Sequence, residues 1–189
     1  MKKVAVFLAD GFEEIEALTV VDVLRRAGEK CDIVSIEGEL VRSAHEIFVK
    51  ADKLLNEEEI KEYDMIVFPG GLPGAENLAN DERIKRIVKC FDEENKFIAA
   101  ICASPAMVLS SAGIEENRYI TSYPGEDFEE MLDKANYVEE LVVVDDNLIT
   151  SRGTATTLLF AYKLVDVLGG NSEKLKEGML WNSLEEEKE

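Results

Sequence analysis

The chain has 189 residues, of which 46% are hydrophobic and 32% charged; this composition excludes a disordered or collagen-like chain and predicts a single domain over residues 1–189. Because 40 Asp and Glu outnumber 21 Lys and Arg, for a formal net charge of −19, we expect neither nucleic acid nor a membrane surface as a partner. The three cysteines form no disulfide or paired metal-ligand pattern, and the N-terminal apolar run ends at Asp10, too early for a secretory core, so we expect a cytoplasmic protein.

Apolar runs alternate with helical patterns along the chain. Strands are predicted at 3–9, 31–36, 65–68, 97–101, 118–121, 141–144 and 148–151. Helices are predicted at 13–27, 56–61, 81–90, 105–112 and 154–168, and a small hairpin is one interpretation of 40–50. Apolar strands separated by helices are typical of a parallel sheet covered on both faces. The expected fold is therefore a flavodoxin-like, doubly wound, mostly parallel α/β sandwich, in which ligands bind beyond the carboxyl ends of the strands.

An acidic residue heads the apolar stripe of the first predicted helix. Glu16 precedes Val20, Val23, Leu24 and Ala27 at helical spacing. Burial would disfavour its ionised form and raise its pKa. A preference of acids for the first turn of a helix explains Glu13 and Glu14, and it remains an alternative for Glu16.

Glycines follow the third predicted strand, in the segment Pro69-Gly70-Gly71. Glycine allows close approach of the backbone, and free N–H groups there can bind an anion, although a tight turn alone would also explain the motif. The segment matches neither a phosphate loop nor a dinucleotide fingerprint.

A cysteine follows the fourth strand in the run Ile101-Cys102-Ala103-Ser104-Pro105. A strand that leads into a residue just before a helix resembles a nucleophile elbow. The helix N-terminus would favour the thiolate and lower the pKa of Cys102, whereas the alternative is an inert buried cysteine. In the strand order 2-1-3-4-5, Glu16 could hydrogen-bond the Cys102 sulfur, and N–H groups near Gly71 and Ala103 could form an oxyanion hole.

Four segments together resemble the ThiJ/PfpI superfamily, in its parkinsonism-associated deglycase branch. They are VAVFLADGFEEIEALTVVDVLRRAG, MIVFPGGLPGAENL, FIAAICASPAMVL and LITSRGTATTLLFAYKLVDVLGG. The resemblance implies a flavodoxin-like homodimer with a reactive, easily oxidised cysteine at Cys102 and a protonated pocket glutamate at Glu16. It also implies an oxyanion position at Gly70-Gly71 with Ala103 as a second donor.

The chain departs from the family pattern at two positions. The family's pocket histidine falls on Tyr123, and a phenol is a poor base near neutral pH. The protease branch has a histidine directly after the cysteine, where this chain has Ala103. A Cys–His dyad would require His45, the only histidine, which we expect to be solvated; a peptidase is therefore not expected.

The resemblance and the residues together predict a Cys-dependent glyoxalase or deglycase acting on 2-oxoaldehydes such as methylglyoxal or on their adducts. Its catalytic residues would be Cys102 and Glu16, and its pocket residues Gly70, Gly71, Ala103 and Tyr123. No cofactor and no metal are expected. The alternative is a non-catalytic oxidative-stress sensor or chaperone-like dimer that uses oxidation of the same cysteine.

Overall fold

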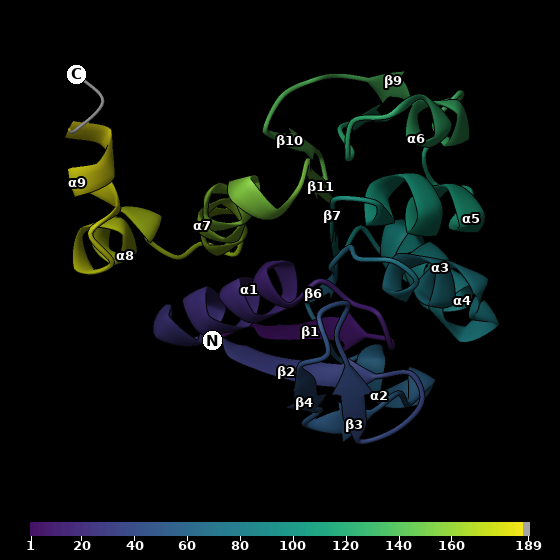
Figure 1. Ribbon diagram of the computed structural model, residues 1–189, viewed down its shortest axis with the longest axis horizontal. Helices are drawn as coiled ribbons and strands as arrows, with labels where there is room; N and C mark the ends of the chain where they lie inside the picture. The colour runs from purple at the N-terminus through teal and green to yellow at the C-terminus, as the bar shows by residue number, and fades with distance from the viewer. Residues whose placement is uncertain (187–189) are drawn as a thin grey trace.

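The computed structural model describes residues 1–186, and its core is a seven-stranded sheet between two layers of helices (Figure 1). The strand order is β10-β11-β7-β6-β1-β2-β5. The strands are β1 (Lys3–Leu8), β2 (Lys30–Ser35), β5 (Lys53–Leu54), β6 (Met65–Phe68), β7 (Phe97–Ile101), β10 (Val142–Asp145) and β11 (Leu148–Ser151). All neighbours pair in parallel except β10 with β11. The central order β2-β1-β6-β7-β11 confirms the predicted flavodoxin-like topology.

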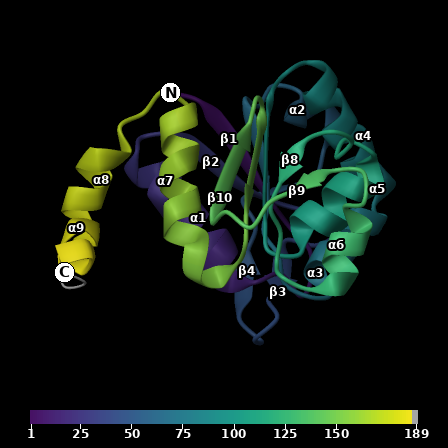
Figure 2. The ribbon, with the colours of Figure 1, turned by 90° about the horizontal axis from the view of Figure 1, so that it is seen from above.

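Helices cover both faces of this sheet (Figure 2). One face packs against α1 (Glu14–Arg26) and α7 (Thr157–Val167). The other face packs against α3 (Gly74–Asn80), α4 (Glu82–Glu93), a π-helical segment η1 (Pro105–Leu109) and α5 (Ser110–Ala112). Because alternate side chains of a strand point to opposite faces, Ala5 and Phe7 of β1 join one core while Val4 and Val6 join the other.

Smaller elements lie at the edges of this sandwich. They are β3 (Leu40–Arg42), β4 (Phe48–Lys50), α2 (Glu57–Ile60), β8 (Tyr119–Ile120), α6 (Glu126–Met131), β9 (Asn136–Tyr137), the 3-10 turn η2 (Thr154–Thr156), α8 (Ser172–Gly178) and α9 (Trp181–Glu186). The pair β3–β4 is antiparallel and confirms the hairpin. The strand expected at 118–121 does not join the main sheet. It is the short β8, which pairs with β9 instead.

The first helix begins and ends where its sequence provides caps. Glu13 is the N-cap, and its Oε2 accepts the Glu16 N–H at 2.7 Å. Arg25 and Arg26 lie in the last turn, where cations suit the helix dipole. Gly28, with φ of 85°, then adopts the left-handed conformation that glycine tolerates best.

The sheet order brings three strand ends together. β1 and β6 are neighbours, and so are β6 and β7, with Val67 opposite both Val6 and Ala99. Because these strands are parallel, the segments after β1, β6 and β7 emerge at the same edge. These segments contain Glu16, Gly70 and Cys102. Among residues 1–186, no helix has the length and apolarity needed to cross a membrane.

Candidate active site

Cys102 occupies a sharp turn at the end of β7. Its φ of 66° is in the left-handed region, which few residues other than glycine adopt, and such strain is frequent at functional positions. The turn is anchored on both sides, because the Cys102 N–H donates to the Ser151 carbonyl at 3.1 Å and the Cys102 carbonyl accepts from the Tyr123 N–H at 2.8 Å. The geometry therefore agrees with the expected elbow.

Glu16 lies in the first turn of α1 and is fully buried. The Gly70 N–H donates to Glu16 Oε2 at 2.8 Å, and the Thr154 hydroxyl donates to Oε1 at 3.1 Å. The carboxyl group also hydrogen-bonds the Cys102 sulfur. The structure therefore brings Glu16 and Cys102 together, as the sequence pattern suggests.

Burial controls the protonation of Glu16. Desolvation, with a smaller contribution from the neighbouring Glu13 charge, raises the pKa of Glu16 from its ordinary value of 4.5 to about 7, against the lowering effect of the hydrogen bonds from Gly70 and Thr154. No cation pairs with Glu16 among the described residues. A carboxyl group with this pKa can both accept and donate a proton near neutral pH.

The expectation of a lowered thiol pKa at Cys102 is wrong. Burial and, next, the adjacent Glu16 together raise the pKa of the Cys102 thiol to about 12, against the lowering effect of the Gly71 and Ala103 N–H groups. The helical segment after the cysteine is only a short π-helical turn, Pro105–Leu109, followed by three α-helical residues. Desolvation and the carboxylate outweigh that short helix, so the resting sulfur is a thiol that hydrogen-bonds Glu16.

The backbone donors around the sulfur have two different roles. The Gly71 and Ala103 N–H groups face the Cys102 sulfur and are the available donors for an oxyanion there. The Gly70 N–H is not available, because Glu16 already accepts it. Gly70 acts instead as a spacer: a Cβ atom at this position would lie 2.5 Å from Cys102 Cβ and 2.7 Å from Glu16 Oε2. Gly70 is therefore a pocket residue without being an oxyanion donor.

Tyr123, at the family's histidine position, borders the site through its backbone. Its ring is half exposed and packs edge-on against Phe128, with centroids 6.0 Å apart. No hydrogen bond of its hydroxyl is found within residues 1–186. Among the described contacts, Tyr123 acts on the elbow through its N–H group.

The other cysteines lack the surroundings of Cys102. Cys31 lies in β2, where burial raises its pKa to about 12. Cys90 lies on α4 beside Glu94, and burial raises its pKa as well. All three cysteines are free. Neither Cys31 nor Cys90 has a buried acid and backbone donors around its sulfur in the described contacts.

His45 is largely exposed, as expected, but it is not isolated. Its Nδ1 lies 2.9 Å from Glu14 Oε1 in the turn between β3 and β4. This hydrogen bond raises the pKa of His45. Burial acts to raise the pKa of Glu14, but hydrogen bonds, including that from His45, outweigh it and hold the pKa below its usual range. His45 does not contact Cys102 among the described interactions, so no Cys–His dyad is found there.

Two functional contacts were not predicted from the sequence. Thr154 donates to Glu16 from the segment after β11, and Glu13 caps the helix that carries Glu16. The sequence position of Thr154 could have indicated its contact with Glu16, since Thr154 lies shortly after the end of β11, and β11 is the neighbour of β7. Arg152, which follows β11, donates to the Glu139 carbonyl at 2.9 Å.

The chain is similar to known proteins in both sequence and fold. Residues 2–167 match the DJ-1/PfpI family. Protein DJ-1 homolog B of Arabidopsis thaliana is 39% identical over 175 residues, 92% of this chain; the chain spans only 40% of that relative's length. Glutathione-independent glyoxalase DJ-1 of Schizosaccharomyces pombe is 31% identical over 88% of this chain and 91% of the relative. The structure of oxidized Toxoplasma gondii DJ-1 superposes with a TM-score of 0.88 at 37% identity, over 95% of this chain and 98% of that one.

Proposed function

The chain belongs to the DJ-1/PfpI family, and from this premise we propose that it is a Cys-dependent, glutathione-independent glyoxalase or deglycase. Its substrates are 2-oxoaldehydes such as methylglyoxal, or the adducts that these form with amino and thiol groups. The observation that carries the proposal is the fully buried Glu16 carboxyl group at the Cys102 sulfur. The similarity to a relative named as a glyoxalase supports the reaction class.

The first step is attack of the Cys102 sulfur on the aldehyde carbon. Because the resting sulfur is a thiol, the Glu16 carboxylate accepts its proton as the carbon–sulfur bond forms. The aldehyde oxygen becomes negative, is stabilised by the Gly71 and Ala103 N–H groups, and then takes the proton from Glu16, which returns Glu16 to the carboxylate form. The product of this step is a hemithioacetal.

The second step moves a proton between two carbons. Glu16 removes the proton from the former aldehyde carbon and returns it to the neighbouring carbonyl carbon, while the hydroxyl proton of the hemithioacetal passes to the neighbouring oxygen, which gives a thioester of a 2-hydroxy acid. Water then hydrolyses the thioester, releases the 2-hydroxy acid and restores the thiol. A pKa of about 7 suits Glu16 for both directions of proton transfer near neutral pH.

The test is lactate formation from methylglyoxal by wild type, Cys102→Ser and Glu16→Gln. We expect Cys102→Ser to fall to the uncatalysed rate and Glu16→Gln to lose about 10²–10⁴-fold. The matched control is Cys90→Ser, which alters a cysteine outside the site and should retain the wild-type rate. Equal rates in wild type, Cys102→Ser and Glu16→Gln would contradict the proposal.

A redox sensor is the second candidate, and the same donors favour it. Two molecules of peroxide would each transfer one oxygen atom to the Cys102 sulfur and leave as water, giving a sulfinic acid. Protonated Glu16 and the two N–H groups could then hydrogen-bond the sulfinate oxygens.

Intact mass after mild peroxide treatment tests this second function. A sensor gains two oxygen atoms at Cys102, and Cys102→Ser does not gain them. Oxidation spread over Cys31 and Cys90 would argue against it. One protein can have both functions, because the Cys102 thiol turns over methylglyoxal until peroxide oxidises it.

The homodimer and the cytoplasmic location expected from the sequence also remain proposals. Large apolar side chains of Leu40, Ile47 and Phe48 are exposed on the β3–β4 hairpin, which suits a contact with a second copy of this chain. Light scattering after size exclusion should give the mass of two chains for wild type and of one chain for Phe48→Asp. A monomeric wild type would contradict the dimer.

A further inference from the structure

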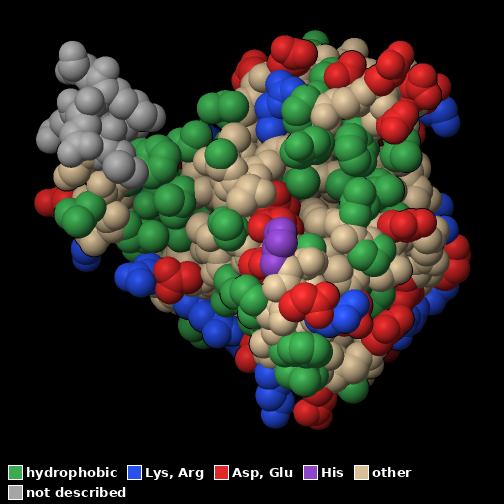
Figure 3. Space-filling model, in the orientation of Figure 1, with side chains coloured by type: hydrophobic (Ala, Val, Ile, Leu, Met, Phe, Trp, Pro, Cys, Tyr) green, Lys and Arg blue, Asp and Glu red, His purple; other side chains and the backbone are tan. Residues whose placement is uncertain are grey.

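Two acidic residues and the only histidine come together beside the candidate active site. Glu13 and Glu14 begin α1, and His45 lies in the turn between β3 and β4. Backbone hydrogen bonds attach this turn to the segment before α1. The Gly11 N–H donates to the Arg42 carbonyl at 2.7 Å, and the Ala44 N–H donates to the Phe12 carbonyl at 2.8 Å. The histidine, purple in Figure 3, lies next to acidic side chains near the middle of this face.

The spacing of these three side chains fits one metal ion. One potential ligand atom from each residue lies within 4.8 Å of the other two. Ligands about 2.1 Å from one tetrahedral ion lie about 3.4 Å apart, so the ligand atoms must approach one another by up to about 1.4 Å to complete the set. The His45 side chain is 70% exposed and can make this movement.

A buried carboxylate oxygen in the cluster lacks a partner. Glu14 is only 9% exposed, and its Oε2 has no hydrogen-bond partner, whereas its Oε1 lies 2.9 Å from His45 Nδ1. A buried oxygen of a charged group without a partner is costly. A bound cation would supply that partner.

The two carboxylates of the cluster also lack nearby cations that would balance their negative charge. Among residues 1–186, neither Glu13 nor Glu14 forms an ion pair with a lysine or arginine. Glu13 Oε2 caps the Glu16 N–H, but a carboxylate has about four acceptor positions and can cap a helix and bind an ion together.

We propose that Glu13, Glu14 and His45 bind one divalent first-row transition-metal ion, with Zn²⁺ as the best match to their ligand chemistry. Two carboxylates and one imidazole are ligands that Zn²⁺ accepts, and three protein ligands leave a position for water. This site is distinct from Cys102, which contributes no ligand to it. The proposal does not depend on the proposed glyoxalase activity.

The test is calorimetric titration of the full chain with ZnCl₂ at pH 8 in a non-coordinating buffer. Wild type should bind one ion per chain. His45→Ala and Glu14→Gln should each weaken the affinity at least about tenfold, since even residues that only support a ligand commonly contribute that much. Glu46→Gln, a neighbouring exposed acid, is the matched control and should keep the wild-type affinity, as should Cys102→Ser and Cys90→Ser.

Three outcomes would overturn the proposal. The first is no saturable binding by wild type. The second is equal weakening by Glu46→Gln, which would indicate a general attraction to surface charge. The third is binding that is lost in either cysteine variant and retained in His45→Ala, which would assign the ion to a thiol. Melting curves of every variant verify that each one is folded.

Discussion

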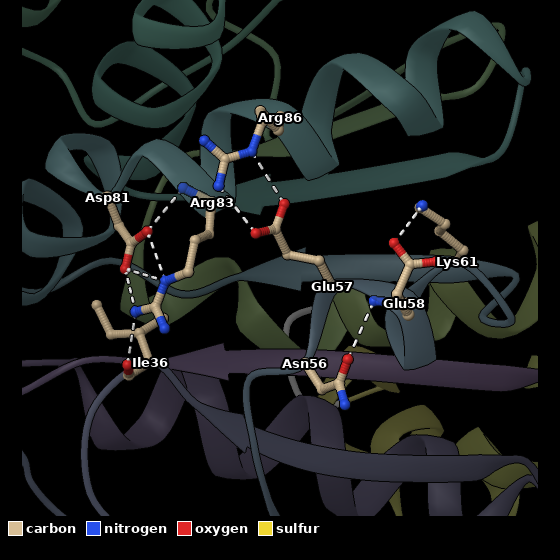
Figure 4. Close-up of polar contacts among 8 residues, drawn as sticks. All are labelled: Ile36, Asn56, Glu57, Glu58, Lys61, Asp81, Arg83 and Arg86. Atoms are coloured by element: carbon tan, nitrogen blue, oxygen red, sulfur yellow. Dashed lines mark hydrogen bonds and ion pairs between the residues drawn. The ribbon is translucent and has the colours of Figure 1, made fainter.

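Carboxylates in two regions of this molecule differ in what surrounds them. On the surface between α2 and α4, Glu57 receives two hydrogen bonds from Arg86, at 2.8 and 3.0 Å, and Asp81 pairs with Arg83 (Figure 4). These arginines lower the pKa of both acids. At the elbow, Glu16 has backbone and hydroxyl donors but no cation, and burial raises its pKa to about 7.

The difference separates structural acids from a chemically useful one. An acid paired with arginine stays ionised at neutral pH and cannot exchange protons there. Glu16 can do so because a desolvated site disfavours its charge. The cost of that charge should appear as lost stability once the carboxyl group ionises, since a pKa shift is also a difference in folding free energy.

The largest expected effect is therefore on stability against pH. The pKa of Glu16 is raised in the folded state, so its stabilising contribution is complete below its ordinary pKa of 4.5 and is lost as the pH rises through about 7. This shift corresponds to about 3 kcal/mol. Relative to Glu16→Gln, wild type should lose that amount between pH 4.5 and pH 8, as measured by urea unfolding of both proteins.

The comparison between the two proteins cancels the titration of every group that does not interact with Glu16. A constant difference between wild type and Glu16→Gln from pH 4.5 to pH 8 would show that Glu16 does not titrate in this range. The surface acid provides the converse control: the difference in stability between wild type and Glu57→Gln should stay constant from pH 5 to pH 8, since the lowered pKa keeps Glu57 ionised throughout.

The next effect concerns the close approach of the Gly70 backbone. A Cβ atom there would lie 2.5 Å from Cys102 Cβ and 2.9 Å from its sulfur. Gly70→Ala should lower the free energy of unfolding by about 2 kcal/mol through overpacking and should abolish methylglyoxal turnover. Gly38→Ala, whose nearest neighbour would lie at 3.9 Å, is the matched control. If Gly70→Ala and Gly38→Ala have similar stability and activity, the Glu16 and Cys102 side chains can move apart without loss, and the expected overpacking is wrong.

A smaller effect is expected at the surface pair. Arg86→Met should leave the free energy of unfolding almost unchanged, because the arginine and Glu57 side chains are 58% and 33% exposed and solvent screens the pair. The pKa of Glu57 should move up toward its ordinary value while Cys102 reactivity is unchanged. NMR titration of the Glu57 carboxyl carbon measures the first effect. A changed alkylation rate at Cys102 would show that the surface pair influences the active site, which contradicts the separation of the two regions.

The smallest effect is expected for Tyr123→Phe. Since its hydroxyl has no hydrogen bond among the described residues and its backbone N–H holds the elbow, kcat/KM for methylglyoxal should change less than about twofold. A loss of tenfold or more would assign a proton-transfer role to the phenol. An unchanged melting temperature would verify that Tyr123→Phe is folded.

Much of the fold could be predicted because its strands are long apolar runs. Buried runs such as Met65–Phe68 and Phe97–Ile101 leave little doubt about a covered parallel sheet. The missed elements α3, α6, α8 and α9 are six or seven residues long, and α6 has no buried residue. Such short segments take their structure from tertiary contacts that periodicity does not reveal.

The sequence indicated which residues form the site, but it did not indicate the protonation state of Cys102. The stripe headed by Glu16 and the small residues around Cys102 indicated both residues. The direction of the Cys102 pKa was predicted wrongly, since a sequence shows that a helix follows but neither its short π-helical form nor the desolvation of the sulfur. The contact of His45 with Glu14 spans 31 residues and has no metal-ligand spacing to reveal it.

The most direct test of the Glu16–Cys102 pair is the pH dependence of Cys102 alkylation by iodoacetamide, followed by mass spectrometry of the Cys102 peptide. Sulfur attack requires the pair to have lost one proton, which Glu16 releases near pH 7. In wild type the rate should therefore rise up to about pH 7 and then level off, and Glu16→Gln should lack this step. A wild-type rate already level at pH 5, or a step that persists in Glu16→Gln, would contradict the account.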